Sequence, residues 1–525
     1  MSGAVSTSHH LATEAGAAAL RAGGTAIDAA IAAAAALCVV YPNNVALGGD
    51  LVALVRDPEG RIRFVNATGP AATGVRPDEL RERHGDALPD RGIDTVTVPG
   101  GVRGWESLAA MGARLGWAQL LAPALGYARE GHPVARSVAR AIVLDRAALE
   151  ADPGCRDTFL PDGRPLQQGE WFRQPALADT LSAIADAGPE AFYVGALAER
   201  WVAGLRALGS AITTTDVAAY RPAVEEPIST TFGDVEVFTS PPNTQGFSLL
   251  RTLRAIEAEG LADPLGADAG RLAEIFASGN RMRSAHLADP AAMRVTIDDL
   301  LDGPDPAAEP ADARVATGDT VGLVAVSDEG WAVSLVQSVY WAFGSAVLEP
   351  STGVLFQNRG TSFSLDPQHP ASITPGLRPP HTLMPVLVER EGRLAVAQAT
   401  MGGQAQPQIH AQLLLRTLAG AGPAEATSAP RWVVGAQDDG DTVATLTAES
   451  DVPDAVRARL AETALELKPV PAHDERLGHS NLIRAAGSGL DAASDPRSDG
   501  SAIVVEPGGS TRVVEPVSRN GEPQP

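Results

Sequence analysis

A threonine that follows an aspartate at the start of an apolar run carries the clearest chemistry in this sequence. Thr320 stands directly after Asp319 and before the apolar run 321–326. If the Asp319–Thr320 peptide bond were cut, Thr320 would hold a nucleophilic hydroxyl and a free α-amine on one residue. An α-amine has an ordinary pKa of about 7.7–8.0, so it can accept the hydroxyl proton near neutral pH. The pattern is compatible with acyl transfer, but taken alone it favours the alternative, a threonine that merely begins a strand.

Two apolar runs around this threonine predict a β-hairpin that would position it. The run 321–326 is followed by a polar turn at 327–330 and a second run at 331–339. Upstream, residues 302–317 are rich in Pro, Ala and acidic side chains without any period, which predicts an exposed, mobile segment. Such a segment would let the Thr320 hydroxyl attack the Asp319 carbonyl, whereas an ordinary interdomain linker would have no chemical role.

The rest of the chain alternates helical and strand patterns and predicts an α/β sandwich. We expect helices at 26–40, 105–130, 136–150, 245–259, 270–287 and 406–418, and strands at 51–55, 62–66, 383–388 and 394–399. Paired strands in the centre with helices before and after them favour stacked layers. The tail from Gly508 is expected to fray.

Composition excludes several classes of function. The 525 residues include 41 basic and 64 acidic side chains, a formal charge of −23, which argues against nucleic acid or an anionic membrane as partner. Cys38 and Cys155 are too few for a disulfide framework. Residues 1–10 lack the pattern of a secretory signal, and no apolar run is long enough to span a bilayer, so we expect a cytoplasmic protein. No ligand spacing typical of a metal or nucleotide site occurs, so no cofactor is expected.

Nine short blocks follow one another along the chain in the order of a known family. They lie at 9–16, 20–30, 98–101, 174–175, 241–246, 320–339, 343–345, 401–403 and 494–497. With these blocks the chain resembles the γ-glutamyltransferase (glutathione hydrolase) family of N-terminal-nucleophile hydrolases. The resemblance implies a four-layer αββα sandwich and a self-cleaving precursor. Its products, residues 1–319 and 320–525, would form an intertwined heterodimer in one globule, with a higher oligomer left open.

The same resemblance assigns catalytic roles. It implies that Thr320 is the nucleophile, that Ser338 supplies a second hydroxyl beside it, and that the backbone N–H groups of Gly402 and Gly403 form the oxyanion hole. From the residues alone, Ser338 could instead be a strand residue that faces solvent, and the glycine pair could be a plain turn before the helix at 406–418.

Departures from the family pattern fall on the substrate-binding positions. The stretch 66–71 lacks the arginine that binds the α-carboxylate of a γ-glutamyl group. Arg359 stands where the family has an acidic residue for the α-amine, so it would repel an ammonium group and attract a carboxylate; an arginine that points to solvent is the alternative. The further candidate substrate-binding residues are Tyr340, Asn358, Ser362, His381 and Thr382. The connection between Phe363 and Arg378 is short, so we expect no lid and an open pocket.

The leading hypothesis is a self-processing threonine hydrolase or acyltransferase that cleaves a γ-glutamyl-type amide through an acyl-enzyme on Thr320. Water or an amine would accept the acyl group. Because the donor positions differ, a glutaryl-type or other N-acyl amide acylase, as in the β-lactam acylases, is the main alternative. An uncleaved, inactive relative that acts as a binding protein is the third.

Overall fold

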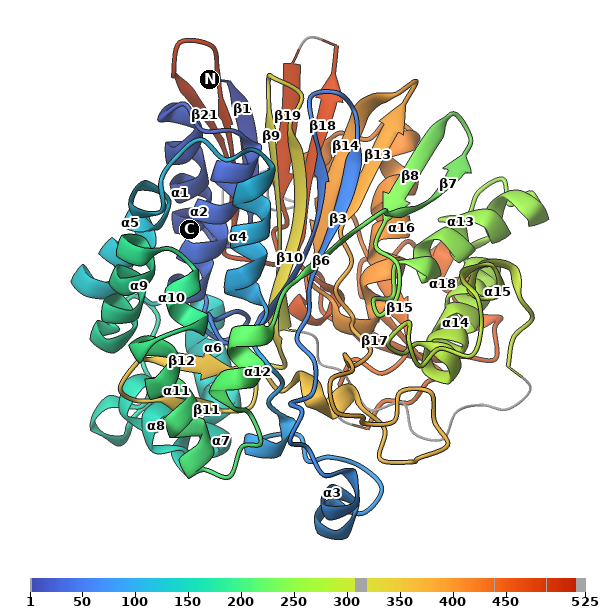
Figure 1. Cartoon of the computed structure of the whole chain (residues 1–525). Helices are drawn as coiled ribbons and strands as arrows, with labels where there is room; N and C mark the ends of the chain where they lie inside the picture. The colour runs from blue at the N-terminus through green and yellow to red at the C-terminus, as the bar shows by residue number, and fades with distance from the viewer. Residues whose placement is uncertain (1, 307–318, 439, 488, 516–525) are drawn as a thin grey trace.

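The computed structural model describes residues 2–306, 319–438, 440–487 and 489–515 (Figure 1). Most of the segment 302–317, for which the sequence predicts a mobile linker, lies outside these ranges. None of the helices in the described ranges combines the length and the apolar character that a membrane span needs.

Two sheets lie face to face in the centre of the molecule (Figure 1). The first contains, in spatial order, β21 (Thr511–Val514), β20 (Ser501–Val505), β1 (Gly3–Thr7), β9 (Asp319–Ser327), β10 (Ala332–Tyr340), β2 (Asp50–Arg56), β3 (Ile62–Ala67) and β6 (Ala223–Glu225). The second contains β19 (Gly489–Ser494), β18 (Ser480–Ala486), β14 (Arg393–Thr400), β13 (Val386–Arg390), β8 (Val235–Thr239) and β7 (Ile228–Phe232). All neighbours in both sheets are antiparallel, and an apolar layer that includes Val52, Val324 and Ala397 fills the space between them.

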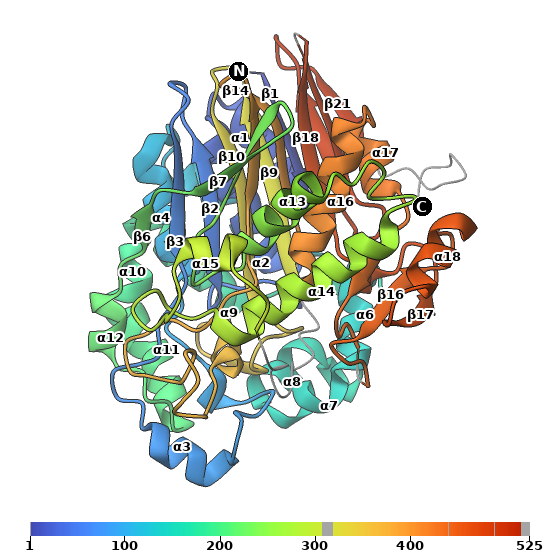
Figure 2. The same ribbon diagram turned by 90° about the vertical axis from the view of Figure 1, so that its right-hand side faces the viewer.

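Helices cover the outer face of each sheet. On the first sheet lie α1 (His10–Arg21), α2 (Ala26–Val40) and α4 (Gly101–Gly112), and α5 (Trp117–Glu130) packs against α2. On the second lie α13 (Phe247–Glu259) and α16 (Gln406–Leu418), with α14 (Ala269–His286) packed against α13; Figure 2 shows all three in front of the strands. The α2 helix is buried over its whole length, since its Ala-rich surface lets neighbours approach closely, and Thr25 with Asp28 caps its start. The predicted four-layer αββα sandwich is confirmed.

The remaining elements surround this core. The helices are α3 (Pro77–His84), α6 (Arg136–Leu144), α7 (Arg146–Ala151), α8 (Pro153–Phe159), α9 (Pro175–Ala187), α10 (Glu190–Tyr193), α11 (Ala196–Ala207), α12 (Thr214–Ala219), α15 (Ile297–Asp302), α17 (Pro423–Ser428) and α18 (Asp454–Ala461). The short strands are β4 (His132–Pro133), β5 (Trp171–Phe172), β11 (Val347–Glu349), β12 (Val354–Phe356), β15 (Trp432–Val434), β16 (Thr445–Glu449) and β17 (Glu466–Val470).

The structure corrects three expectations about elements. The helix expected at 105–130 is two helices, α4 and α5, because the chain leaves helical geometry at Ala113 and Gly116. The helix expected at 136–150 is likewise divided into α6 and α7 at Asp145. The tail does not fray at Gly508, because β21 pairs with β20 as far as Val514; residues 516–525 lie outside the described ranges.

Both sheets combine strands from before and from after the proposed cleavage point. The β1 strand lies between β20 and β9, and β10 pairs with β2. In the second sheet β13 pairs with β8. A cut between Asp319 and Thr320 would therefore produce two pieces that share both sheets.

Candidate active site

Three adjacent strands of the first sheet place a row of polar side chains at one end of its inner face. Side chains alternate along a strand, and Val324, Val336 and Val52 lie in the apolar layer between the sheets. Residues an even number of positions from these valines point to the same face of the sheet. Thr320 on β9, Ser338 on β10 and Asp50 on β2 therefore also face the second sheet. Ser338 and Asp50 are direct cross-strand partners. This row ends the apolar layer and begins the candidate site.

Thr320 is buried and held by two neighbours. Its Oγ1 donates a hydrogen bond to Ser338 Oγ over 3.0 Å, and Asn44 Nδ2 donates to its carbonyl oxygen over 3.0 Å. The Asp319–Thr320 bond lies inside β9, so the structure is that of the uncleaved chain. The buried Ser338 excludes the alternative in which this serine faces solvent.

A β-bulge turns the chain directly after Ser338. The register between β9 and β10 shifts between Gln337 and Tyr340, and Tyr340 has φ of 85°, a conformation rare for a residue with a side chain. The Tyr340 N–H donates to Ser338 Oγ over 2.7 Å. The bulge thus fixes the second hydroxyl and aims the tyrosine ring at the residues that follow β12.

Gly402 and Gly403 lie between the end of β14 and the start of α16, at the level of Thr320. The inward-facing Ser334, opposite Val324, donates to the Gln398 carbonyl, and Gly322 packs against Ala399 and Thr400. Thr320 is two residues from Gly322 and Gly402 is two residues from Thr400, so we infer that Thr320 and the glycine pair face each other. Both glycines have positive φ, 145° and 51°, and a Cβ on Gly402 would lie 2.4 Å from Ile409 Cδ1.

The backbone N–H groups of Gly402 and Gly403 are available to bind an anion. Among the described residues, neither N–H has a hydrogen-bond acceptor, whereas both carbonyl oxygens are occupied. Unsatisfied N–H groups just before a helix can bind a developing negative charge.

Arg359 is fully buried beside this row, which excludes the alternative in which it points to solvent. Its guanidinium carbon lies 3.3 Å from the centroid of the Tyr340 ring, Nη1 donates to Ser362 Oγ over 3.0 Å, and Nη2 donates to Thr382 Oγ1 over 3.1 Å. No carboxylate among the described residues forms an ion pair with it, and its Nε has no hydrogen-bond partner there. Burial lowers the pKa of Arg359 to about 10, against the opposing effects of Tyr340 and Asp50. It is therefore a cation at neutral pH.

Asp50 and His381 form a buried pair next to Arg359. Asp50 Oδ1 accepts hydrogen bonds from the N–H groups of Gly69 and Gly100 and from Gln357 Nε2, and Oδ2 contacts His381 Nε2 over 3.2 Å. Burial raises the pKa of Asp50 to about 7 although these donors and Arg359 oppose the shift. Burial, followed by the charge of Arg359, lowers the pKa of His381 well below its usual value. His381 is thus neutral at pH 7 and donates from Nε2.

Gln245 connects the glycine pair to the arginine side of the site. Its Nε2 donates to the Gly403 carbonyl over 2.8 Å and to the Thr382 carbonyl over 2.6 Å. Its Oε1 accepts from Arg283 Nη1 of α14 over 3.1 Å. Through this amide Thr382, Gly403 and Arg283 are held in one network.

Hydrogen bonds and a ring contact connect Thr320, through Ser338 and Tyr340, to Arg359, and Gln245 connects Thr382 to Gly403. Asn358 completes the group, since its N–H donates to the Val339 carbonyl and its Oδ1 accepts from the Trp341 N–H, each over 3.2 Å. The prediction of an open pocket is not met at Arg359 in the described part of the uncleaved chain, because the Tyr340 ring and the residues around Thr382 cover its side chain.

Sequence reasoning missed Asp50, Gln245 and Arg283 as site residues. Asp50 could have been recognised as a carboxylate that stands between a Gly-Gly pair and an apolar strand. Arg283 could have been recognised as an arginine on the apolar side of α14, seven residues after Phe276. Gln245 lay in a recognised block without an assigned role.

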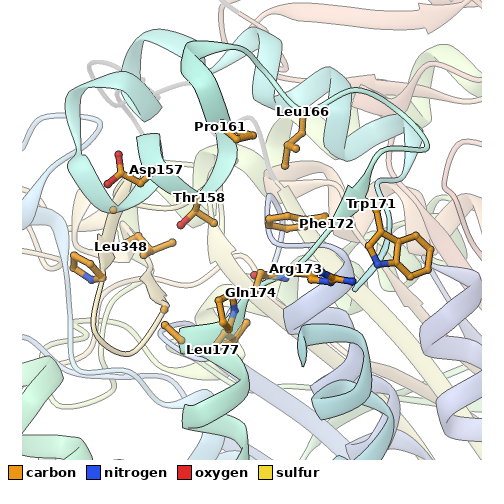
Figure 3. Close-up of a pocket in the computed structure, with 15 residues that line it drawn as sticks. Asp157, Thr158, Pro161, Leu166, Trp171, Phe172, Arg173, Gln174, Leu177 and Leu348 are labelled. Carbon is orange, nitrogen blue, oxygen red and sulfur yellow. The ribbon is translucent and has the colours of Figure 1, made fainter. Parts of the chain in front are cut away.

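A larger pocket lies elsewhere on the molecule and shares no residue with this site. Its volume is about 470 Å³, and it is lined by residues of α8, β5, the start of α9 and β11, among them Phe172, Leu177 and Leu348 (Figure 3). In the described part of the chain no cluster of His, Cys, Asp or Glu side chains is arranged to hold a metal ion.

Comparisons with known proteins agree over nearly the whole chain. A family model described as Gamma-glutamyltranspeptidase matches residues 12–505. An oxamate amidohydrolase proenzyme of Klebsiella pneumoniae is 38% identical over 94% of this chain and 97% of its own length. A glutathione hydrolase-like YwrD proenzyme of Bacillus subtilis is 36% identical over the same shares.

Solved structures give the same picture. The cephalosporin acylase of Bacillus halodurans superimposes with a TM-score of 0.87 and 32% identity, covering 95% of each chain. The match extends through both sheets and both helical layers. The chain therefore belongs to the gamma-glutamyltranspeptidase family and is an enzyme with the N-terminal-nucleophile hydrolase fold.

Proposed function

We propose that this chain cuts itself between Asp319 and Thr320 and then hydrolyses a small amide whose acyl part ends in a carboxylate. In maturation, Thr320 Oγ attacks the Asp319 carbonyl carbon, the peptide C–N bond breaks and the nitrogen takes the hydroxyl proton. Water then cleaves the resulting ester. Residues 1–319 end in a carboxylate, and residues 320–525 begin with a free α-amine.

The mature site would repeat the chemistry on a substrate. Thr320 Oγ attacks the amide carbon while the Thr320 α-amine takes its proton, and the N–H groups of Gly402 and Gly403 stabilise the oxyanion. The C–N bond breaks, the proton passes to the leaving amine, and an ester remains on Thr320. Attack by water, or by another amine, releases the acyl group. The contact between Thr320 Oγ1 and Ser338 Oγ supports this role, since Ser338 holds the nucleophile in place.

The buried charge of Arg359 is the observation that carries the substrate proposal. A buried guanidinium without a carboxylate partner is costly unless a ligand supplies the negative charge. Its contacts to Ser362 and Thr382 leave Nε for such a ligand. The same charge would repel the α-ammonium of a γ-glutamyl group. Glutaryl-type and oxamate-type acyl groups, which carry a carboxylate and no ammonium, therefore fit better; the name of the oxamate amidohydrolase relative is in line with this.

A γ-glutamyl donor is the second candidate, because the glutathione hydrolase-like relative is nearly as similar. Turnover of oxamate, a glutaryl anilide and a γ-glutamyl anilide by the purified protein separates the two candidates. We expect oxamate or the glutaryl anilide to be preferred, and replacement Arg359→Met to lower kcat/KM for it roughly tenfold to hundredfold. A strong γ-glutamyl preference that survives Arg359→Met would overturn the carboxylate proposal.

Intact-mass measurement tests maturation separately. We expect two masses that correspond to residues 1–319 and 320–525, and one full-length mass for Thr320→Ala. A wild-type chain that stays at full length on prolonged incubation would instead support the uncleaved binding protein.

A further inference from the structure

A second buried arginine, Arg283, is connected to the glycine pair through its neighbours. Arg283, on α14, donates to Gln245 Oε1 and to the side chain of Gln404, the residue directly after Gly403. Both partners are neutral amides, and no carboxylate among the described residues forms an ion pair with Arg283. Burial lowers its pKa to about 10, so it is charged at neutral pH. Its positive charge is therefore not neutralised by the described part of the protein.

Arg283 also lines a small cavity. This cavity, of about 60 Å³, is bounded by Asn280, Ser284, Gln404, Val443 and Leu465. Its volume corresponds to about two water molecules or one carboxylate group. Arg281 lines the same cavity, yet Asp305 pairs with it, so Arg283 supplies the uncompensated charge.

Gln245 links the glycine pair to both arginines through different atoms. Its Nε2 donates to the carbonyl oxygens of Gly403 and Thr382, and Thr382 Oγ1 accepts from Arg359, whereas its Oε1 accepts from Arg283. If the carbonyl oxygen of a substrate occupies the glycine pair and its acyl end reaches Arg359, Arg283 is a second cation beside the pair that can receive the amine end.

We propose that the cavity at Arg283 is the leaving-group subsite and that it binds a carboxylate on the amine half of the substrate. The preferred substrate is then an amide with a carboxylate at each end, an N-carboxyacyl amino acid. The same subsite would receive an amino acid as acyl acceptor. This inference rests on the proposed function and extends it to the amine half of the substrate.

Two substrates that share the same acyl group test the subsite: N-glutaryl glycine and N-glutaryl glycinamide, which differ only in the carboxylate of the amine half. We expect wild-type protein to prefer the glycine compound roughly tenfold to hundredfold in kcat/KM. Arg283→Gln should remove this preference by slowing the glycine compound, while Arg283→Lys, which keeps the charge, should retain part of it. Arg271→Gln is the matched control, because Arg271 lies on the same helix but pairs with Glu259 and Glu274.

The outcomes separate the two proposals. If Arg283 only stabilised the loop at Gly403, Arg283→Gln would lower kcat/KM equally for both compounds. That result would overturn the subsite. Equal turnover of both compounds by wild-type protein would overturn it as well. If neither compound nor any amide of the panel above is turned over by cleaved protein, the proposed function itself fails.

Discussion

Ser338 is the residue whose removal isolates the support given to the nucleophile. Its hydroxyl contacts Thr320 Oγ1 and accepts the Tyr340 N–H. In Ser338→Ala both groups lose a buried partner, so we expect self-cleavage and turnover to slow about tenfold or more. Ser338→Thr, which keeps a hydroxyl at the position, should retain most of both rates. The time course of cleavage by mass spectrometry measures the effect, and identical rates in Ser338→Ala and wild type would refute it.

Asp50 predicts a specific dependence of stability on pH. Its pKa is raised from 3.8 to about 7 in the folded chain, so between these values the folded state keeps a proton that the unfolded state has released. The stabilisation is fully present below about pH 4 and is lost as the pH rises through about 7. We expect Asp50→Asn to lack this decline.

The measurement compares the free energy of unfolding of Thr320→Ala with that of Thr320→Ala/Asp50→Asn from pH 4 to pH 8, in chains that do not cleave. The lowered pKa of His381 acts in the opposite sense, since that contribution is lost as the pH falls through its unfolded value, but it is common to both chains. Parallel curves for the two chains would show that Asp50 does not titrate as we expect.

At the scale of elements, the turn between β14 and α16 sets the geometry of the proposed oxyanion hole. We expect Gly402→Ala to cost about 1–3 kcal/mol, from its positive φ and the contact with Ile409, and to lower turnover about a hundredfold or more because the N–H groups move. Gly420→Ala is the matched control: Gly420 has φ of 105° at the other end of α16, and no atom lies near its added Cβ. It should lose stability but keep its turnover. Equal turnover losses in both variants would show that strain alone explains the effect.

Helices and strands that depend on a local sequence pattern were predictable from the sequence. The contacts between these elements were not. The hairpin of β9 and β10 follows from its apolar runs and polar turn, and α2 from its cap and its uninterrupted apolar character. The bulge at Tyr340 has no such signature, because it depends on how β10 pairs with β9 and β2 at once. For the same reason Ser338 and Arg359 could not be told from solvent-facing residues.

At the candidate site, too, local motifs were predictable from the sequence and contacts between distant residues were not. Thr320 and the glycine pair were found from motifs that resemble a family, whereas Asp50, Gln245 and Arg283 act through partners far away in the sequence. Asp50 contacts Gln357 and His381, and Gln245 contacts Gly403; these pairs form only once distant segments of the chain have packed together. A single sequence carries no local record of such pairs.

At the scale of the whole molecule, the shared sheets predict that cleavage does not separate the products. The β1 strand forms ladders with β20 and β9 on its two sides, and β13 pairs with β8. We expect residues 1–319 and 320–525 to elute together in size-exclusion chromatography under native conditions and to part only in denaturant. Separate elution without denaturant would contradict the pairing.

The position of β1 between two strands from the other side of the cut also changes how the enzyme can recover from damage. Before the cut, refolding involves one chain and does not depend on concentration. Afterwards two chains must meet and thread their strands back into one ladder, a second-order reaction that becomes slow in dilute solution. If the chain cuts itself as we propose, the mature protein has no unimolecular route back to the folded state and persists through the height of its unfolding barrier.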